Sequence, residues 1–411
     1  MDNQSEQLLC DRVGEPFYLA HPESFREAVS TFKRAFRKFF PRFEVGYSYK
    51  TNPLHVFCRE ANRMGVYAEV VSPEELSLAR HLGVHGSRII FNGPCKDEQS
   101  IRWCIEQDAL INIDSWRDLE TVEELVRNDR QALKRIGVRL NFTEAGLVSR
   151  FGFDAACPET LSVFRRLSGM SPDCDFILHS HVADRSLESV KAQTVGMSDF
   201  FRQLVSENIR VSGFNLGGGF MSNLSEPLRL SLAIEQVSFE DYAETIHQVF
   251  GSCGIDVESF DFYAEPGTAV VAGSLSLFGQ VIDLRKRSDG STIATTNLSR
   301  FDAYARATLP DLPCRLVTNE LRDPPDADTI LTGYTCIESD ILHTRFPYEV
   351  RVGDWIVFDD VGSYSTVFKP PFIKGAHPVL SLQESGAVYV ERHRQTWDHM
   401  FPGDLIESNL L

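Results

Sequence analysis

Lys50, in the sequence VGYSYKTN, is the first side chain along the chain that could act as a nucleophile. Aromatic and apolar neighbours reduce the hydration of a lysine amine, which favours its neutral, nucleophilic form. A lysine at the end of a strand is most often only solvated, so Lys50 alone does not assign a function. Its meaning depends on the residues that share its site.

Three consecutive glycines, Gly217, Gly218 and Gly219 in NLGGGF, follow an apolar segment. Because they have no Cβ atom, they let backbone N–H groups approach an anion closely, and a following helix would add the positive end of its dipole. A phosphate site and a flexible turn both fit this sequence. It is not GxGxxG with a downstream acid, so a dinucleotide-binding fold is not favoured.

Three further segments carry side chains for acid–base chemistry. Glu265 in YAEPGT could hydrogen-bond a ring nitrogen and hold it protonated, although a solvated or ion-paired glutamate is the simpler interpretation. His179 and His181 in HSHV lie on one side of a strand, which would suit a metal pair. The sequence offers no third ligand at a convincing spacing, so we expect no metal and a stacked or hydrogen-bonded imidazole. Cys336 in LTGYTCIESDIL is a potential proton donor or a buried small hydrophobe.

The elements that position these residues follow from the hydrophobic pattern. Between residues 22 and 270, apolar segments alternate with helical patterns, and the first helix repeats Phe or Val at positions 25, 29, 32 and 36. About eight apolar segments predict a closed (β/α)8 barrel, or TIM barrel, with an open doubly wound sheet as the competing architecture. Sites in such barrels lie at the carboxyl ends of the strands, where the candidate residues up to Glu265 fall.

Helix starts are predicted at two places. Asn52 and Pro53 indicate a cap and first turn for the helix after the first strand, and Ser72-Pro73-Glu74-Glu75 is typical of a capping box. From residue 271 to 411 the segments alternate or are continuously apolar, with no strong helical stretch between them. This part predicts a β domain, to which FYLA within residues 1–21 could add a strand.

Composition excludes several classes of function. The chain has 411 residues and a formal net charge of -17, which argues against nucleic acid and against an anionic membrane surface. No apolar run approaches the roughly 18 residues that cross a bilayer. Nine cysteines without CxxC pairs suggest neither a disulfide framework nor a zinc site. We therefore expect a cytoplasmic protein.

The order of the motifs resembles one family across nearly the whole chain. A lysine in YSYKTN, a histidine in HSHV, and then NLGGGF, AEPG, GYTC and VFDDVGSYS follow the order and spacing of the alanine-racemase-like, fold-type III enzymes, in their ornithine, arginine and diaminopimelate decarboxylase branch. The resemblance implies pyridoxal 5′-phosphate as cofactor and an amino acid as substrate. It also implies a homodimer whose active sites are shared between subunits.

The same resemblance implies roles for the residues that bind the cofactor. Lys50 would carry it as a Schiff base, His181 would stack on its ring, and Glu265 would pair with the ring nitrogen. The triple glycine would bind the phosphate, together with Tyr364 in GSYS. Decarboxylation leaves electrons on Cα, which a protonated ring accepts. Glu265 therefore favours decarboxylation over racemisation, because the racemases of this fold place an arginine there.

The sequence departs from the family pattern at the phosphate. Thr268 follows EPG where arginine is usual, so it would offer the phosphate a hydroxyl but no charge. Asp184 stands where a phosphate-binding serine is usual, and a second anion is not expected to contact phosphate. Arg185 and Ser186 are possible substitutes.

A further departure concerns the substrate pocket. The resemblance implies that Cys336 of the second subunit protonates the carbanion and that Phe372 in KPPF lines the same pocket. Diamine-forming members have an acid after the cysteine, where this chain has Ile337, and an isoleucine cannot pair with a buried cation. This favours a modified or non-diamine substrate in a specialised pathway, although Glu338 or Asp340 could reach the substrate after a loop shift.

Other assignments stay open. Arg150 in SRFG could meet a substrate carboxylate or form a structural ion pair. The whole chain could also be a non-catalytic relative that binds a protein partner, or a racemase or epimerase. Intact Lys50, Glu265 and Cys336 favour the decarboxylase.

Overall fold

The computed structural model describes residues 1–129, 133–143, 146, 149–182, 184–221, 236–303, 311–318, 320, 322–369 and 372–401. The chain divides into two compact units. One consists of residues 25–223 and 236–271, and the other of residues 1–24, 224–235 and 272–411.

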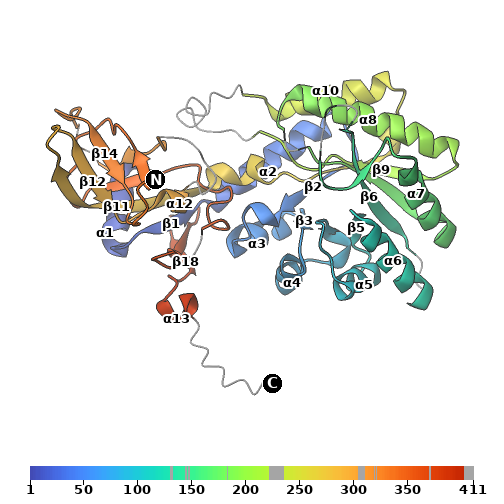
Figure 1. The fold of residues 1–411 in the computed structure, drawn as a ribbon, viewed down its shortest axis with the longest axis horizontal. Helices are drawn as coiled ribbons and strands as arrows, with labels where there is room; N and C mark the ends of the chain where they lie inside the picture. The colour runs from blue at the N-terminus through green and yellow to red at the C-terminus, as the bar shows by residue number, and fades with distance from the viewer. Residues whose placement is uncertain are drawn as a thin grey trace, which may run out of the picture. The chain divides into compact units, whose positions relative to one another are not determined.

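The first unit is a closed barrel of eight parallel strands (Figure 1). Each strand pairs with its neighbours in parallel, and the pairing of β5 with β6 closes the ring. The predicted TIM barrel is confirmed, and this closure rules out the open sheet. The strands are β2 (Phe43–Ser48), β3 (Tyr67–Val70), β4 (Ile89–Phe91), β5 (Leu110–Ile113), β6 (Arg135–Asn141), β8 (Asp175–His179), β9 (Val211–Asn215) and β10 (Asp261–Ala264).

Helices alternate with the strands along the chain. They are α2 (Pro22–Arg37), α3 (His55–Arg63), α4 (Pro73–His81), α5 (Glu98–Glu106), α6 (Trp116–Asp129), α7 (Pro158–Met170), α8 (Leu187–Ser206), α10 (Phe239–Ser252) and the short α11 (Thr268–Val271). Phe25, Val29, Phe32 and Phe36 of α2 are buried, as the helical spacing predicts. Short elements complete this unit: η1 (Tyr49–Thr51), η2 (Gly86–Arg88), β7 (Phe153–Asp154) and η4 (Val257–Ser259).

The barrel interior contains an apolar layer with a polar layer beside it. Ile90, Leu110, Ile177 and Tyr263, from four different strands, pack together as a buried cluster. Side chains two positions apart on a strand point the same way, so the residues two positions further along also face the interior. Those residues are polar: Asn92, Asn112, His179 and Glu265. The carboxyl end of the barrel is therefore lined with buried polar groups.

The second unit is a nine-stranded sheet, with the strand order β15-β14-β12-β11-β1-β17-β18 and with β16 bridging β11 and β13. Its elements are α1 (Asn3–Val13), β1 (Phe17–Ala20), η5 (Ala272–Ser274), β11 (Leu275–Lys286), β12 (Thr292–Thr296), α12 (Arg300–Ala303), β13 (Arg315–Leu316), β14 (Thr329–Thr332), β15 (Ile341–His343), β16 (Trp355–Phe358), β17 (Val379–Leu382), β18 (Val388–Arg392) and α13 (Trp397–Met400). The predicted β domain is confirmed.

The core of this unit joins the amino terminus to strands far along the chain. β1, the FYLA segment, pairs antiparallel with β11 and parallel with β17. Phe17 stacks on Phe278 with ring centroids 4.7 Å apart, and Trp355 packs beside them. Among the described residues, no helix is both long enough and apolar enough to cross a bilayer.

Candidate active site

Glu265, directly after β10, is the centre of the buried polar layer. Its carboxylate accepts hydrogen bonds from Asn215 Nδ2 at 2.6 Å and from Asn92 Nδ2 at 2.9 Å, and His179 Nε2 lies 3.4 Å from its Oε2 atom. Burial by itself would raise the pKa of Glu265, but the charge of His179, a hydrogen bond from it, the charge of Lys50 and the Asn92 amide outweigh burial and hold the pKa well below its usual range. The buried carboxylate is therefore ionised.

Lys50 is linked to Glu265 through two intervening side chains. It lies in η1, immediately after β2, and its Nζ atom is 2.7 Å from Oε2 of the fully buried Glu69. The same Asn92 amide that donates to Glu265 donates to Glu69 Oε1 at 2.8 Å. Asn92 is oriented in turn by Asn112, whose Nδ2 donates to Asn92 Oδ1 at 2.6 Å. The amine and the carboxylate thus belong to one hydrogen-bonded network.

His181 is joined to the glycine turn. Gly218 donates its backbone N–H to His181 Nδ1 at 3.1 Å, which fixes the ring orientation. Burial, with the nearby positive charges of Lys50 and Arg139, lowers the pKa of His181 to about 3. The imidazole is therefore neutral at physiological pH and presents an uncharged ring face.

The glycine turn needs its glycines for reasons of space. Gly217 and Gly219 have φ angles of +64° and +90°, which side chains other than glycine rarely adopt. A Cβ atom on Gly219 would lie 2.0 Å from the Val182 carbonyl oxygen, and one on Gly218 would lie 2.9 Å from His181 Cε1. The Gly217 carbonyl accepts the Glu265 N–H at 2.7 Å, so the turn is tied to the residue at the centre of the polar layer.

The ligating atoms of His179, His181 and Glu265 all lie within 4.8 Å of one another. The sequence offered no convincing third partner for the two histidines, and barrel closure brings Glu265 to them. Three such groups could hold a metal ion. Of their nitrogens, His179 Nε2 lies 3.4 Å from Glu265 Oε2, and His181 Nδ1 already accepts the Gly218 N–H.

Several positions depart from the family pattern at the expected phosphate site, and their side chains lie near the starts of two helices. Asp184 accepts hydrogen bonds from the Ser186 N–H at 3.1 Å and from Ser189 Oγ at 2.6 Å, at the start of α8. The Ser189 bond, with the Ser186 N–H, lowers the pKa of Asp184. Ser186 is the N-cap of α8. Thr268 opens α11, directly after the EPG segment.

Each of the remaining predicted residues has defined surroundings within its own unit. In the barrel unit, the exposed Arg150 stacks on Phe151 at 4.0 Å. In the β unit, Cys336 and Ile337 are exposed on the loop between β14 and β15. Phe372 is also exposed, and Tyr364, with a φ angle of +65°, stacks on Phe368 at 5.4 Å.

Asp340 is buried, and its carboxylate joins its own loop to the residues at the start of α12. It accepts hydrogen bonds from Ser299 Oγ at 3.0 Å, from the Arg300 N–H at 2.9 Å and from Thr335 Oγ1 at 2.6 Å. The sequence suggested that Asp340 could reach a substrate. A substrate that reached Asp340 would have to compete with these bonds, and the contact with substrate stays a prediction.

Sequence reasoning missed four members of the polar layer: Glu69, Asn92, Asn112 and Asn215. Each is a polar residue within or directly after an otherwise apolar strand, in YAEV, FN, INI and FNL. A polar side chain inside such a strand is costly unless it is hydrogen-bonded, and that cost is the signal that could have identified them.

Comparison with known proteins gives a consistent result. The family described as "Pyridoxal-dependent decarboxylase, pyridoxal binding domain" matches residues 25–272. A diaminopimelate decarboxylase of Methanocaldococcus jannaschii is 25% identical, with 98% of this chain and 94% of that protein covered. An ornithine decarboxylase of Schizosaccharomyces pombe is also 25% identical, with 79% and 74% covered. The crystal structure of the M. jannaschii diaminopimelate decarboxylase has the same fold, with a TM-score of 0.86 at 22% identity and with 98% of this chain and 95% of that chain covered.

Proposed function

The chain belongs to the pyridoxal-dependent decarboxylase family, and from this premise we propose that it acts on a modified or non-diamine amino acid in a specialised biosynthetic pathway. Its cofactor is pyridoxal 5′-phosphate, and its reaction is the decarboxylation of an amino acid. The proposal concerns the substrate, the roles of the individual residues and the oligomeric state.

The residues of the barrel fit the three reactive parts of this cofactor. An aldehyde needs an amine, and Lys50 supplies one next to the polar layer. A pyridine nitrogen needs an acidic partner, and Glu265 is buried and ionised. A phosphate needs N–H donors, and the turn at residues 217–219 has no Cβ atoms to block them. The network that joins Lys50 to Glu265 through Glu69 and Asn92 is the observation that carries the proposal.

The bound cofactor supplies a sink for the electron pair that remains when the α-carboxylate leaves as carbon dioxide. In this proposal, Glu265 holds a proton on the ring nitrogen, which strengthens that sink. Asn92 and Asn215 keep the Glu265 carboxylate in place and ionised. The neutral His181 ring packs against the cofactor, and Cys336 Sγ gives a proton to Cα before regaining one from water.

The substrate assignment rests on Ile337, which is 36% exposed beside Cys336. An isoleucine offers no charge to a distal ammonium group. We further propose a homodimer in which the Cys336 loop of one subunit completes the active site of the other.

The test is carbon dioxide release from a panel of free and N-acylated amino acids, together with the visible absorbance of the holoenzyme. Borohydride reduction should attach the cofactor permanently to the Lys50 peptide. Lys50→Ala should abolish absorbance and turnover, whereas Lys191→Ala, at an exposed position on α8, should change neither.

Three results would contradict the proposal. Protein that stays colourless with added cofactor would remove the Lys50 assignment. Cofactor binding without turnover of any amino acid would indicate a non-catalytic relative. Deuterium uptake from solvent at Cα without loss of carbon dioxide would indicate a racemase or epimerase.

A further inference from the structure

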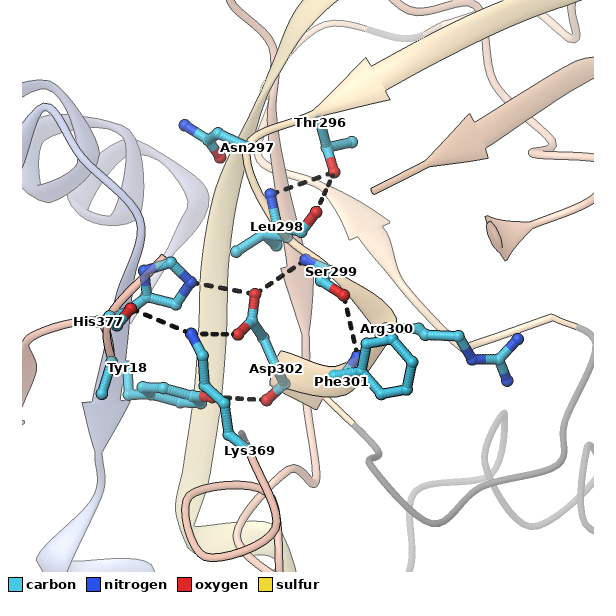
Figure 2. A network of polar contacts seen from close by, with 12 residues as sticks. Tyr18, Thr296, Asn297, Leu298, Ser299, Arg300, Phe301, Asp302, Lys369 and His377 are labelled. Carbon is cyan, nitrogen blue, oxygen red and sulfur yellow. Dashed lines mark hydrogen bonds and ion pairs between the residues drawn. The ribbon is translucent and has the colours of Figure 1, made fainter. Parts of the chain in front are cut away.

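Asp302, on α12 of the β unit, is a fully buried carboxylate that the proposed reaction does not use. Figure 2 shows three donors converging on it: Lys369, His377 Nε2 at 3.1 Å and the Ser299 N–H at 2.8 Å. Burial alone would raise the pKa of Asp302, but the bond from His377 and the charge of Lys369 lower it. Asp302 is therefore an ionised anchor whose charge is already shared.

This anchor holds Lys369 and His377, and residues 372–376 lie between them in the chain. Lys369 also donates to the Gly375 carbonyl at 3.3 Å, and Ala376 exchanges hydrogen bonds with Gln395. Lys374 precedes Gly375 directly. Its backbone is therefore held in place within the β unit.

The Cys336 loop is attached to the same part of the chain. The Tyr334 N–H donates to the Leu298 carbonyl at 3.0 Å, and Asp340 connects Thr335 to Ser299. The residues around Ser299 thus hold two segments, one with Cys336 and one with Lys374.

The ammonium group of Lys374 packs over an aromatic ring of the Cys336 loop. Its Nζ atom lies 4.1 Å from the centroid of Tyr334, two residues before Cys336. Within the part of the chain that the structure describes, no carboxylate forms an ion pair with Lys374, and Asp302 is engaged by Lys369 and His377. Burial and the positive charges of Arg394 and Lys369 lower the pKa of Lys374. The charge of Asp302 acts in the opposite direction, but that carboxylate is bound by Lys369 and His377, so within the described residues it is not a direct partner of the partly buried Lys374 ammonium group.

We propose that Lys374 is a specificity residue that binds a carboxylate at the distal end of the substrate. The inference rests on the proposed decarboxylation and deepens it. The family resemblance places Ile337 where diamine-forming members carry an acid, and the charge that faces the Cys336 loop from the neighbouring segment is positive. The rival is Glu338, the exposed acid on the same loop, which would instead favour a distal ammonium group.

The experiment compares amino acids of matched length that differ in distal charge. Glutamate is paired with ornithine and 2-aminoadipate with lysine, each as both enantiomers, and norleucine is the uncharged reference. Carbon dioxide release gives kcat and KM, and the shift of the cofactor absorbance on mixing gives a dissociation constant without turnover. We expect the distal carboxylate to be preferred within at least one pair.

Lys374→Met should lower kcat/KM for the preferred dicarboxylate about 10- to 100-fold, the usual worth of a charge-assisted hydrogen bond. A distal contact that does not change during the reaction is expressed mainly in KM, so kcat should change little. Norleucine kinetics should stay the same, which shows that the variant is folded. Lys374→Arg should retain the preference, and Lys286→Met, at an exposed position of β11, is the matched control.

A wild-type preference for ornithine or lysine that Glu338→Gln abolishes would overturn the inference and leave the decarboxylation intact. A preference for the dicarboxylate that survives Lys374→Met would also overturn it. Holoenzyme that releases no carbon dioxide from any amino acid would remove the proposed function itself, and the inference with it.

Discussion

Two glutamates near the carboxyl end of the barrel have opposite electrostatic environments. Glu265 is surrounded by donors and positive charge, so its pKa falls although it is fully buried. Glu75 on α4 is partly buried, but its main donor is the Val71 N–H at 2.8 Å and Glu69 is a negative neighbour. Burial, reinforced by Glu69, therefore raises the pKa of Glu75 to about 7. Burial alone does not determine whether a carboxyl group is ionised.

Glu265→Gln should lower kcat by about 100-fold or more, because a neutral amide cannot hold a proton on the ring nitrogen. The glutamine NH2 group would also face an asparagine donor, which costs about 1–3 kcal/mol of unfolding free energy. Steady-state kinetics and urea unfolding would measure the two effects. Glu265→Asp keeps the charge and should retain more activity. Equal kcat values in wild type and Glu265→Gln would exclude the proposed role.

Glu75 should make the apoprotein less stable as the pH rises. Its pKa is about 7 in the folded chain and 4.5 in the reference state, so the unfolded chain loses this proton first. The penalty grows from about pH 4.5 to about pH 7 and is then constant, at about 1–3 kcal/mol. Glu75→Gln should therefore have a higher urea midpoint than the wild type at pH 8, and this difference should be smaller at pH 5. Glu74→Gln, at an exposed position, is the control, and an equal pH dependence in both variants would contradict the assignment.

Secondary-structure elements show where sequence patterns suffice and where they fail. The eight apolar segments became the eight barrel strands because each is short, buried and bounded by polar turns. The helix after β2 begins at His55 with Leu54 as N-cap, so the prediction from Asn52 and Pro53 was wrong. Asn52 instead accepts the Leu54 N–H at 3.1 Å, which holds the turn between η1 and α3.

The predicted capping box at α4 is only half formed. Ser72 Oγ accepts the Glu75 N–H at 3.2 Å, as expected for an N-cap. The Glu75 carboxylate, however, accepts the N–H of Val71 and not that of Ser72. A sequence pattern states that a glutamate can reach back along the chain, but the local backbone decides which N–H it finds.

The candidate site, too, could be predicted from the sequence only in part. Lys50, the glycines and Glu265 are each recognisable within a short motif. Their connection is not, because Glu69, Asn92 and Asn112 come from three further strands that meet only when the barrel closes. Alternation within a strand predicts which side chains face inward, but not which inward side chains from other strands they meet.

Gly219→Ala should weaken cofactor binding at least about 10-fold, because the new Cβ atom would displace the Val182 carbonyl and with it the turn proposed to bind the phosphate. Gly169→Ala is the matched control. Gly169 lies in α7 with nothing within 4 Å of an added Cβ atom, so this change should leave cofactor affinity unchanged. Titration of the apoprotein with pyridoxal phosphate, followed by absorbance, compares them. Equal affinities would mean that the turn does not hold the phosphate.

At the scale of the whole molecule, the proposal draws on residues of both units. The barrel would supply the groups for the cofactor, and the β unit would supply Cys336, Tyr364 and Lys374. Such a division gives a reason for the long-range hydrogen bonds that fix the Cys336 loop in the β unit, since a proton donor must be held at a defined point relative to Cα. It also makes the proposed dimer testable without a structure of the complex.

Lys50→Ala and Cys336→Ala should each be nearly inactive alone but should recover activity when mixed. Random exchange of subunits makes about half of the dimers mixed, and each mixed dimer has one intact site out of two, so about a quarter of the wild-type activity should return. Carbon dioxide release after equilibration of the mixture measures this. Mixing Lys50→Ala with the double variant should restore nothing, because no site then has both groups. If the first mixture also stayed inactive although its subunits exchanged, both residues would have to act within one subunit, and the shared site would be wrong.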